Sequence, residues 1–464
     1  MKIPISVESR DEKVKKSLKY SIADGSFYSL MVGFGESFFT AFAIFLKANN
    51  IEIGLISSLP QALGSIAQLY STKLISIFKS RKTPVLINAA LEGLMFLPII
   101  FVYFFGNLKV TFLILFLCLY WIFRMLINPA WSSWMGDLVK PGERGKYFGR
   151  RNKFTGFFTL IALMVGGYLL AANKQNEYLG FVIVFLIAMS ARLISVFFLS
   201  LKYEPSYTQV SGSAFSLQEF LGKAVKTNFG LFAFFLTTMN FSVYLSAPFF
   251  AAFMLRDLQL DYLTFSIIIA VPLITKFLTT DAWGYACDRF GSRKILTMTA
   301  LLISSSPLLW LFSTDFKYLI LIQMYSGFVW AGFEISTFIF ILDCTSTLKR
   351  ATAISYYNLL NGLAVLAGAI VGGIIVKYNS LFWSKYIFIF LVSGIARFAV
   401  AIYFIPKIHE MRHVQKATYT DVLASMFSHS PAPFVQSRPV PMHEDPDRKR
   451  KPKKYSEDYF SDKD

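Results

Sequence analysis

Long apolar runs alternate with short polar connectors over most of this chain. A helix needs roughly 20 apolar residues to span the hydrocarbon core of a bilayer. Twelve runs approach or exceed that length, at residues 22–46, 53–77, 84–105, 110–136, 154–173, 179–201, 227–254, 262–284, 293–313, 317–343, 351–376 and 383–405. The pattern predicts an all-α membrane protein with twelve transmembrane helices.

Composition favours lipid as the surrounding solvent. Of the 464 residues, 55% are hydrophobic and only 16% are charged, whereas about 25% of the residues of ordinary soluble domains are charged. A water-soluble protein of this size would struggle to cover so much apolar surface. We therefore expect membrane lipid as a partner of this chain.

The net charge of +18 raises the question of nucleic-acid binding. The basic residues, however, lie in connectors and terminal segments, and no nucleic-acid-binding motif accompanies them. One set of connectors is rich in them: Lys13, Lys15, Lys16, Lys19, Lys79, Arg81, Lys82, Lys140, Arg144, Lys146, Arg150, Arg151, Lys153, Arg289, Arg293, Lys294, Lys349 and Arg350. The other set has one or two each: Lys47, Lys109, Lys174, Arg256, Lys317, Lys377 and Lys385. The positive-inside rule then predicts both termini on the cytoplasmic side of a cell (plasma or inner) membrane, with no nucleic-acid partner.

Polar stretches divide the chain into five segments. These are a cytoplasmic N-terminal segment (1–21), a six-helix bundle (22–201), a cytoplasmic linker (202–226), a second six-helix bundle (227–405) and a cytoplasmic tail (406–464). Residues 215–225 of the linker have the composition of a short helix on the membrane surface. The tail combines Pro, His, Ser and opposed charges without apolar periodicity, which is typical of disorder.

An internal repeat supports the two bundles. At a shift of 206 residues, the segment after the fourth run matches the segment after the tenth, with seven identities: Asp137 with Asp343, Arg144 with Arg350, Asn152 with Asn358, Gly156 with Gly362, and Val165-Gly166-Gly167 with Val371-Gly372-Gly373. Ala191-Arg192 also matches Ala396-Arg397 at a shift of 205. Many transporters are duplicated bundles of this kind.

The connector after the eighth run carries a motif of glycines, an aspartate and basic residues at fixed spacing: Gly284, Asp288, Arg289, Gly291, Arg293 and Lys294. This motif resembles the signature of the major facilitator superfamily (MFS), which in that family joins helices 2–3 and 8–9. With the repeat and the twelve runs, the resemblance covers about residues 20–405. It implies two pseudo-symmetric six-helix bundles that transport a solute by alternating access.

The resemblance also implies a cytoplasmic latch that stabilises the outward-facing state. The motif residues would form it, together with Asp137, Arg144, Asp343 and Arg350. In the first half only Arg81-Lys82 match the motif and Ser76 stands in place of the aspartate, so a first-half latch would depend on Asp137. The alternative is that all these residues only set loop structure and orientation.

Four ionisable residues fall near the middle of apolar runs: Glu36, Arg124, Lys276 and Glu334. A charge at the bilayer centre costs about 2.5–3.5 kcal/mol on insertion scales, so each calls for a partner or for water. We predict the pairs Glu36–Arg124 and Glu334–Lys276. A nearby cation lowers the pKa of a carboxylate, and the pKa rises when the cation moves away in another conformation. The carboxylate then binds and releases a proton during the transport cycle, which is our hypothesis for Glu36 and secondarily for Glu334. The alternative is a static pair that fixes helix packing.

Other ionisable residues in the apolar runs are weaker candidates. Glu92, Arg192 and Arg397 fall on runs that are peripheral in the resembling family, and we expect structural or snorkelling roles for them. Asp24 and Asp281 lie near the cytoplasmic ends of their runs, where solvation is easy.

In the resembling family helices 1, 4, 7 and 10 line the transport cavity, with helices 2, 5, 8 and 11 beside them. The resemblance therefore implies substrate contacts from polar and aromatic groups on these helices: Gln61, Gln68, Asn128, Trp131, Asn240, Tyr244, Trp330, Tyr357 and Asn361. Aromatic walls with few polar donors suit a small amphipathic organic solute better than an inorganic ion. Each residue taken singly is more often a packing residue than a ligand contact.

Several functions compete with proton-coupled transport. A membrane enzyme is disfavoured because all four histidines lie in the tail and no metal, nucleophile or phosphate-binding motif is present. The three cysteines have no metal-ligand spacing, so we expect neither a metal nor a cofactor nor a disulfide. A channel is disfavoured because channels usually form their pores from repeated subunits or filter loops, and the sequence shows no such loop. An uncoupled facilitator and a non-transporting sensor or scaffold stay open, and we expect a monomer.

Overall fold

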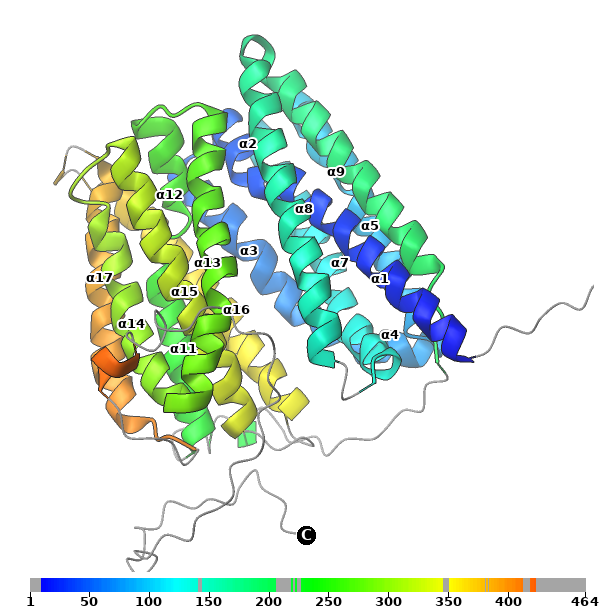
Figure 1. The fold of residues 1–464 in the computed structure, drawn as a ribbon. Helices are drawn as coiled ribbons and strands as arrows, with labels where there is room; N and C mark the ends of the chain where they lie inside the picture. Colours follow the sequence, from blue (N-terminus) through cyan, green and yellow to red (C-terminus); the bar gives the residue numbers. More distant parts are fainter. Residues whose placement is uncertain are drawn as a thin grey trace, which may run out of the picture.

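The computed structural model describes residues 10–140, 144–205, 218–219, 222, 227–344, 350–379, 381–382, 384–411 and 418–422. These residues form helices and connecting turns, with no strand among them. The helices make two bundles that stand side by side (Figure 1).

The first bundle contains six membrane segments, several of them built from consecutive short helices. In chain order they are α1 (Arg10–Phe34) with η1 (Glu36–Phe38) and α2 (Phe39–Phe45); α3 (Asn50–Gln68) with α4 (Ser71–Phe78); α5 (Lys82–Leu94) with α6 (Phe96–Phe101) and η2 (Val102–Phe104); η3 (Gly106–Leu108) with α7 (Lys109–Leu138); α8 (Arg144–Ala172); and η5 (Lys174–Asn176) with α9 (Glu177–Ser200).

The second bundle repeats this order. It contains α11 (Asn228–Tyr244) with α12 (Phe249–Ala252) and the π-helix η6 (Phe253–Asp257), then α13 (Tyr262–Phe290), α14 (Ser292–Leu309), α15 (Phe316–Cys344), α16 (Arg350–Tyr378) and α17 (Lys385–Phe404) with η7 (Ile405–Lys407). α8 and α16 begin and end 206 residues apart, as the sequence repeat predicts.

Ten of the described segments are long and apolar enough to cross a membrane. α3 with α4, and α14, occupy the positions of the second and ninth predicted runs and complete the twelve. The α-helix of the first segment already begins at Arg10, twelve residues before the predicted run. The apolar pattern did not reveal this start because the first turns of the helix are polar.

The same neighbours meet in both bundles, which makes them pseudo-symmetric. Within the first bundle α1 packs on α8 and α9, α3 on α7, and α5 on α7 and α9. Within the second, α11 packs on α16 and α17, α13 on α15, and α14 on α15 and α17. The bundles themselves meet through α3 against α16 and α8 against α13, which is again a symmetric pair of contacts.

The glycines of the repeat make these contacts between bundles possible. A Cβ atom on Gly167 of α8 would lie 2.1 Å from the Ser266 hydroxyl of α13, and one on Gly373 of α16 would lie 3.1 Å from the Ile51 Cα of α3. Small residues let helices approach closely in lipid, where little else drives their association.

The bundles are joined near the end opposite to the chain termini. There Arg256 donates hydrogen bonds to the Asn50 side chain (3.1 Å) and to the Ala48 carbonyl, and the Tyr386 hydroxyl donates to Asn50 (3.0 Å). The Tyr262 hydroxyl donates to Glu177 at 3.1 Å. Toward the end that carries the termini, which we call the terminal end, α8 and α13 diverge (Figure 1). The structure is therefore closed at the opposite end and spread at the terminal end.

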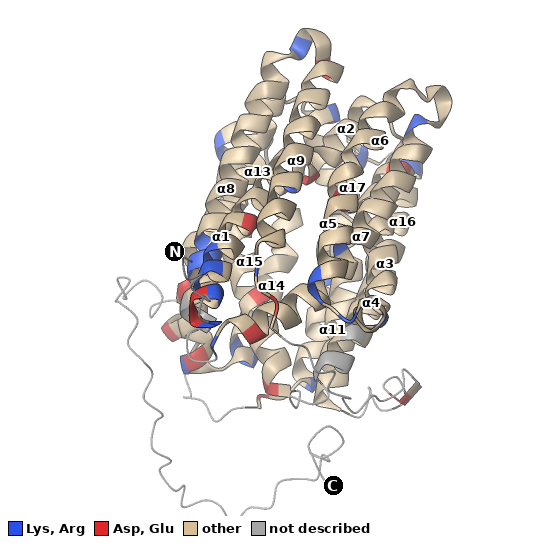
Figure 2. Cartoon of the chain, turned by 90° about the vertical axis from the view of Figure 1, so that its right-hand side faces the viewer, with Lys and Arg blue, Asp and Glu red and all other residues tan. Residues whose placement is uncertain are grey.

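Charged residues gather at the terminal end, where both termini leave the bundles (Figure 2). The predicted surface helix at 215–225 lies mostly outside the described residues. Within the predicted tail, the described residues 406–411 and 418–422 lie against the second bundle, since Ile408 and Val422 are fully buried. The rest of the tail lies outside the described residues.

Candidate functional site

The first and seventh membrane segments are both broken near their middle. α1 ends at Phe34, Gly35 leaves regular helical geometry, and a 3₁₀ turn begins at Glu36. A side chain at position 35 would meet the Phe96 ring at 2.4 Å, so only glycine fits there. In the second bundle α11 ends at Tyr244 and the chain resumes as α12 after Pro248. Discontinuous helices at corresponding positions of two repeats are typical of transporter binding sites.

Glu36 stands at the break and is paired with Arg124 of α7. The Tyr120 hydroxyl, one turn away on α7, donates to the same carboxylate at 2.6 Å. The Arg124 guanidinium also lies over the rings of Trp121 (4.8 Å) and Tyr28 (5.4 Å). Neither partner is sealed off, since the side chains of Arg124 and Glu36 are 19% and 14% exposed.

Lys276 of α13 and Glu334 of α15 form the corresponding ion pair of the second bundle. It is much more open, with 39% and 50% of the side chains exposed. Both pairs expected from the sequence are thus present, whereas the proton-carrying role assigned to them stays a prediction. The surrounding helices therefore cover the second pair less than they cover the first pair.

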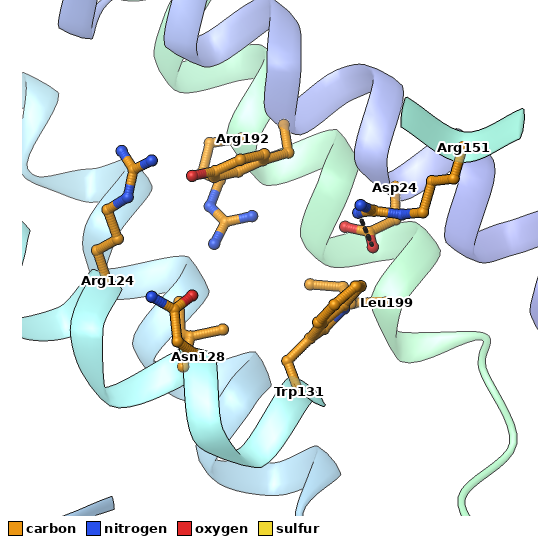
Figure 3. A pocket seen from close by; sticks show the side chains of 9 residues that line it. Asp24, Arg124, Asn128, Trp131, Arg151, Arg192 and Leu199 are labelled. Carbon is orange, nitrogen blue, oxygen red and sulfur yellow. Dashed lines mark ion pairs between the residues drawn. The ribbon is translucent and has the colours of Figure 1, made fainter. Parts of the chain in front are cut away.

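A cavity of ≈170 Å³ opens inside the first bundle, among α1, α7, α8 and α9. It is lined by Asp24, Tyr28, Arg124, Ile127, Asn128, Trp131, Arg151, Arg192 and Leu199. Figure 3 shows Arg124 on one side of it and Arg151 with Asp24 on the other, with Asn128 and Trp131 forming the wall between them. A cavity with this many charged groups is a polar site within the membrane region.

A buried network that the pattern of apolar runs does not reveal lies behind this cavity. Arg192 donates to the Glu92 carboxylate from two nitrogens, at 2.8 and 2.5 Å, and both side chains are almost fully buried. A third Arg192 nitrogen donates to the Ser195 hydroxyl (3.0 Å), which donates to Asp24 (2.8 Å). Arg192 is therefore no snorkelling residue; it faces the interior because α9 turns this side toward α1 and α5.

Asp24 links that network to two further cations. Its carboxylate lies 4.0 Å from Arg151 and 3.8 Å from Lys202. Arg151 stacks over Trp131 at 4.7 Å and donates to the Ser21 carbonyl (3.1 Å). Lys202 is buried, and burial lowers the pKa of its ammonium to about 8 despite the attraction of Asp24. Asp24 is 3% exposed, so the solvation expected for it from the sequence is absent.

Arg397, the repeat partner of Arg192, is also buried, and it is held by neutral acceptors. It donates to the Ile303 carbonyl (3.0 Å) and to the hydroxyls of Ser246 (3.0 Å) and Ser393 (3.2 Å). Of the two roles expected for Arg397, the structural one fits this burial and snorkelling does not. The two bundles therefore differ in chemistry, with charges concentrated in the first.

The predicted cavity residues fall into separate groups. Asn128 and Trp131 line the cavity of the first bundle. Across the two bundles, the Tyr244 hydroxyl donates to Gln61 at 3.4 Å. Within the second bundle, Asn240 of α11 donates to Asn361 of α16 at 2.7 Å. Tyr357, which also lies on α16, packs against α11.

Two predicted cavity residues have other surroundings. Gln68 is the last residue of α3, and Trp330 packs edge-on against Phe333 at 5.7 Å. None of these positions identifies a ligand by itself, so the contact role of all nine stays a prediction.

The terminal end of the first bundle has a clamp built on Arg81. This side chain is fully buried and pairs with Asp137 at 2.5 Å. Its backbone N–H donates to Glu204 at 2.5 Å, and the Ser80 hydroxyl donates to the other oxygen of that carboxylate at 2.7 Å. Asp137 thus pairs with the first-half motif, and its role in a latch stays a prediction. The side chain of Arg144 lies outside the described residues.

The second bundle has a related clamp, in which a glutamate again caps the corresponding turn. The Arg293 backbone N–H donates to Glu410 at 2.9 Å, and the Ser292 hydroxyl donates to Asp343 at 3.4 Å. Gly291 has a φ of +92°, so it supplies the left-handed turn between α13 and α14. A Cβ on Gly284 would meet nothing within 4 Å. The Arg350 side chain lies outside the described residues.

The remaining motif residues make local contacts. Arg289 donates to the Tyr285 hydroxyl at 3.3 Å, and Lys294 lies 5.5 Å from the Tyr419 ring of the tail. Asp288 is solvent-exposed at the end of α13.

The sequence contained a signal for both clamps. Ser80-Arg81-Lys82 recurs as Ser292-Arg293-Lys294, and Glu204 maps on Glu410 at the same 206-residue shift as the rest of the repeat. Glu204 and Glu410 were overlooked because they lie beyond the apolar runs that defined the bundles.

Comparison of the sequence with protein-family models agrees with the two-bundle architecture. The sequence model described as Major Facilitator Superfamily matches residues 25–247 and 230–437. Comparison with curated proteins finds no match.

Several solved structures are similar. They include a point mutant of the nucleoside transporter NupG (16% identity, TM-score 0.68, 84% of this chain and 100% of that chain covered) and a D-xylose–proton symporter (13%, 0.68, 86% and 98%). A bacterial homologue of the iron transporter ferroportin, in an inward-facing state, is also similar (13%, 0.61, 86% and 99%). At such identities the likeness concerns the fold.

Proposed function

Because this chain belongs to the Major Facilitator Superfamily, we propose that it is a secondary active transporter that moves a small organic solute by alternating access. The observation that carries this proposal is the pseudo-symmetric pair of bundles, joined at one end and spread at the other, with charged groups at a break in the first helix. Termini on the cytoplasmic side of a cell membrane would make this conformer inward-facing. The density of basic connectors at the terminal end supports that orientation.

We further propose that Glu36 couples transport to protons. Arg124 and Tyr120 both stabilise the ionised carboxylate in this conformer. Tyr120 and Arg124 reach Glu36 from another helix, α7, and the break at Gly35 lets the two parts of the first segment move separately. When the bundles rock and this contact opens in a drier surrounding, the carboxylate is expected to take up a proton.

Proteoliposomes that contain a trapped pH-sensitive dye test the coupling while the transported solute is still unidentified. Sugars, nucleosides, amino acids and organic acids are added one at a time, and a proton-coupled solute is expected to change the internal pH. Glu36→Gln should abolish that change and leave solute binding intact. Glu52→Gln is the matched control, because Glu52 caps α3 outside the membrane region and Gln can serve the same cap.

The outcomes separate the alternatives. Solute flux without any proton movement would identify an uncoupled facilitator. Solute binding without flux in the same vesicles would identify a sensor or scaffold. Proton movement that survives Glu36→Gln would reject Glu36 as the carrier and shift attention to Glu334.

A further inference from the structure

The charges around the cavity of the first bundle do not cancel. The linked side chains comprise four cations (Arg124, Arg151, Arg192 and Lys202) and three carboxylates (Asp24, Glu36 and Glu92). Two of the cations share Asp24. One positive charge is therefore left without a counter-charge within this cluster.

The cations differ in how fully their donors are used. Arg192 donates from three nitrogens to Glu92 and Ser195, and Arg124 is held by Glu36. Arg151 donates from its Nε to Ser21, but its terminal nitrogen is 4.0 Å from Asp24, beyond hydrogen-bond distance. The Lys202 ammonium is fully buried and makes no hydrogen bond among the described residues. Of the two cations that share Asp24, Arg151 is the one that lines the cavity, so a ligand in the cavity can meet the surplus charge there.

The other walls suit the head group of an organic molecule. Asn128 is exposed to the cavity and can both donate and accept, and Trp131 offers a ring face beside Arg151. A volume of ≈170 Å³ is enough for a carboxylate with a short apolar stem. The guanidinium fork of arginine matches carboxylate geometry.

We propose that this cavity is the head-group subsite for the transported solute, and that the solute is an organic monoanion whose carboxylate binds Arg151 and Asn128. The inference rests on the proposed transport function for its biological meaning, but binding itself is independent of transport. A single surplus charge favours a carboxylate over a phosphate dianion, because a dianion would leave the buried cluster negative.

The test compares probes that share a body and differ in the head group. Purified full-length protein is titrated with benzoate, benzamide, benzylamine and phenyl phosphate, and with hexanoate and hexanamide, and its thermal unfolding is recorded. A ligand that binds only the folded state raises the unfolding temperature. We expect stabilisation by the two carboxylates, less by phenyl phosphate, and none by the amides or the amine.

Variants at neighbouring positions assign the effect to the cavity. Arg151→Gln should weaken carboxylate binding roughly ten- to hundredfold, the range expected for a lost hydrogen bond to a charged group. Arg151→Lys should restore part of it. Arg150→Gln removes the same charge from the same helix at an exposed position outside the cavity, so it should bind like the wild type.

Three results would overturn the proposal: amides that bind as well as the acids, no binding by either carboxylate, or equal losses in the Arg150 and Arg151 variants. Failure of the transport function would look different, since carboxylates would bind through Arg151 while proteoliposomes showed no flux. Flux of an uncharged solute that ignores Arg151→Gln would keep the transporter and reject the anion subsite.

Discussion

The buried Glu92–Arg192 pair offers a prediction whose magnitude follows from the structure. Glu92 of α5 is 0% exposed and Arg192 of α9 is 3% exposed, and two hydrogen bonds of 2.8 and 2.5 Å join them. Glu92→Leu leaves the guanidinium buried beside Ser195 without its counter-charge. Breaking a buried pair from one side costs about 3–5 kcal/mol, because the remaining ion keeps its desolvation penalty.

The double variant Glu92→Leu with Arg192→Met should recover most of that loss. Replacing both ions with apolar side chains of similar volume is often neutral or stabilising by about 1–4 kcal/mol. Arg192 also lies over the Tyr28 ring at 4.9 Å and holds Ser195, so recovery is expected to be incomplete. The pair is therefore expected to show a coupling free energy of several kcal/mol in a double-mutant cycle.

Equilibrium unfolding in mixed micelles, followed by circular dichroism as the denaturing detergent fraction rises, measures these free energies. The exposed Lys276–Glu334 pair supplies the control cycle, because solvent screening should reduce its coupling to about 1 kcal/mol or less. Equal coupling in the two cycles, or a Glu92→Leu variant as stable as the wild type, would refute the buried ion pair between α5 and α9.

Three more predictions concern single features. Gly167→Ala should shift the protein away from the present conformer, because the added methyl group has no room against α13. Gly156→Ala is the control and should leave the conformer unchanged, since its methyl group has room. Spin-label distances between the two bundles at the terminal end report the conformer of each variant. Glu204→Gln and Glu410→Gln should each destabilise the turn that the glutamate caps. Because the two turns occupy corresponding positions of the repeat, both variants should change the spin-label distances at the terminal end in the same direction. Burial lowers the pKa of the Lys202 ammonium from 10.5 to about 8, so the buried charge destabilises the folded wild type by about 3 kcal/mol below pH 8. Lys202→Met removes this charge, and its free energy of unfolding should be higher by that amount. That advantage should vanish as the pH rises to about 10.5, because the folded wild type loses the proton before the unfolded chain does.

The fold was accessible from the sequence because lipid imposes a simple code. Apolar runs of membrane length, basic connectors on alternate sides and a 206-residue repeat each predicted the twelve-segment architecture, and the family comparison confirms it. The pairs Glu36–Arg124 and Lys276–Glu334 were predictable because an ion in the middle of an apolar run needs a partner.

The cavity was harder to predict, because hydropathy does not show which face of a helix points inward. Arg192 lies on a helix that is peripheral in the family, yet its side chain reaches the interior beside Asp24 and Glu92. Arg151 and Lys202 stand at the ends of apolar runs, where orientation signals and site residues look alike in sequence. Only three-dimensional packing separates these two roles.

Transport by alternating access requires that the charged cavity be exposed to each side of the membrane in turn, and one-sided labelling detects this exposure. Asn128→Cys, in a chain whose three native cysteines are replaced by serine or alanine, is reconstituted in one orientation and treated with a membrane-impermeant thiol reagent from either side. We predict modification from both sides, faster from the terminal side that is open in this structure. Modification from one side alone, however long the exposure, would contradict transport by this protein.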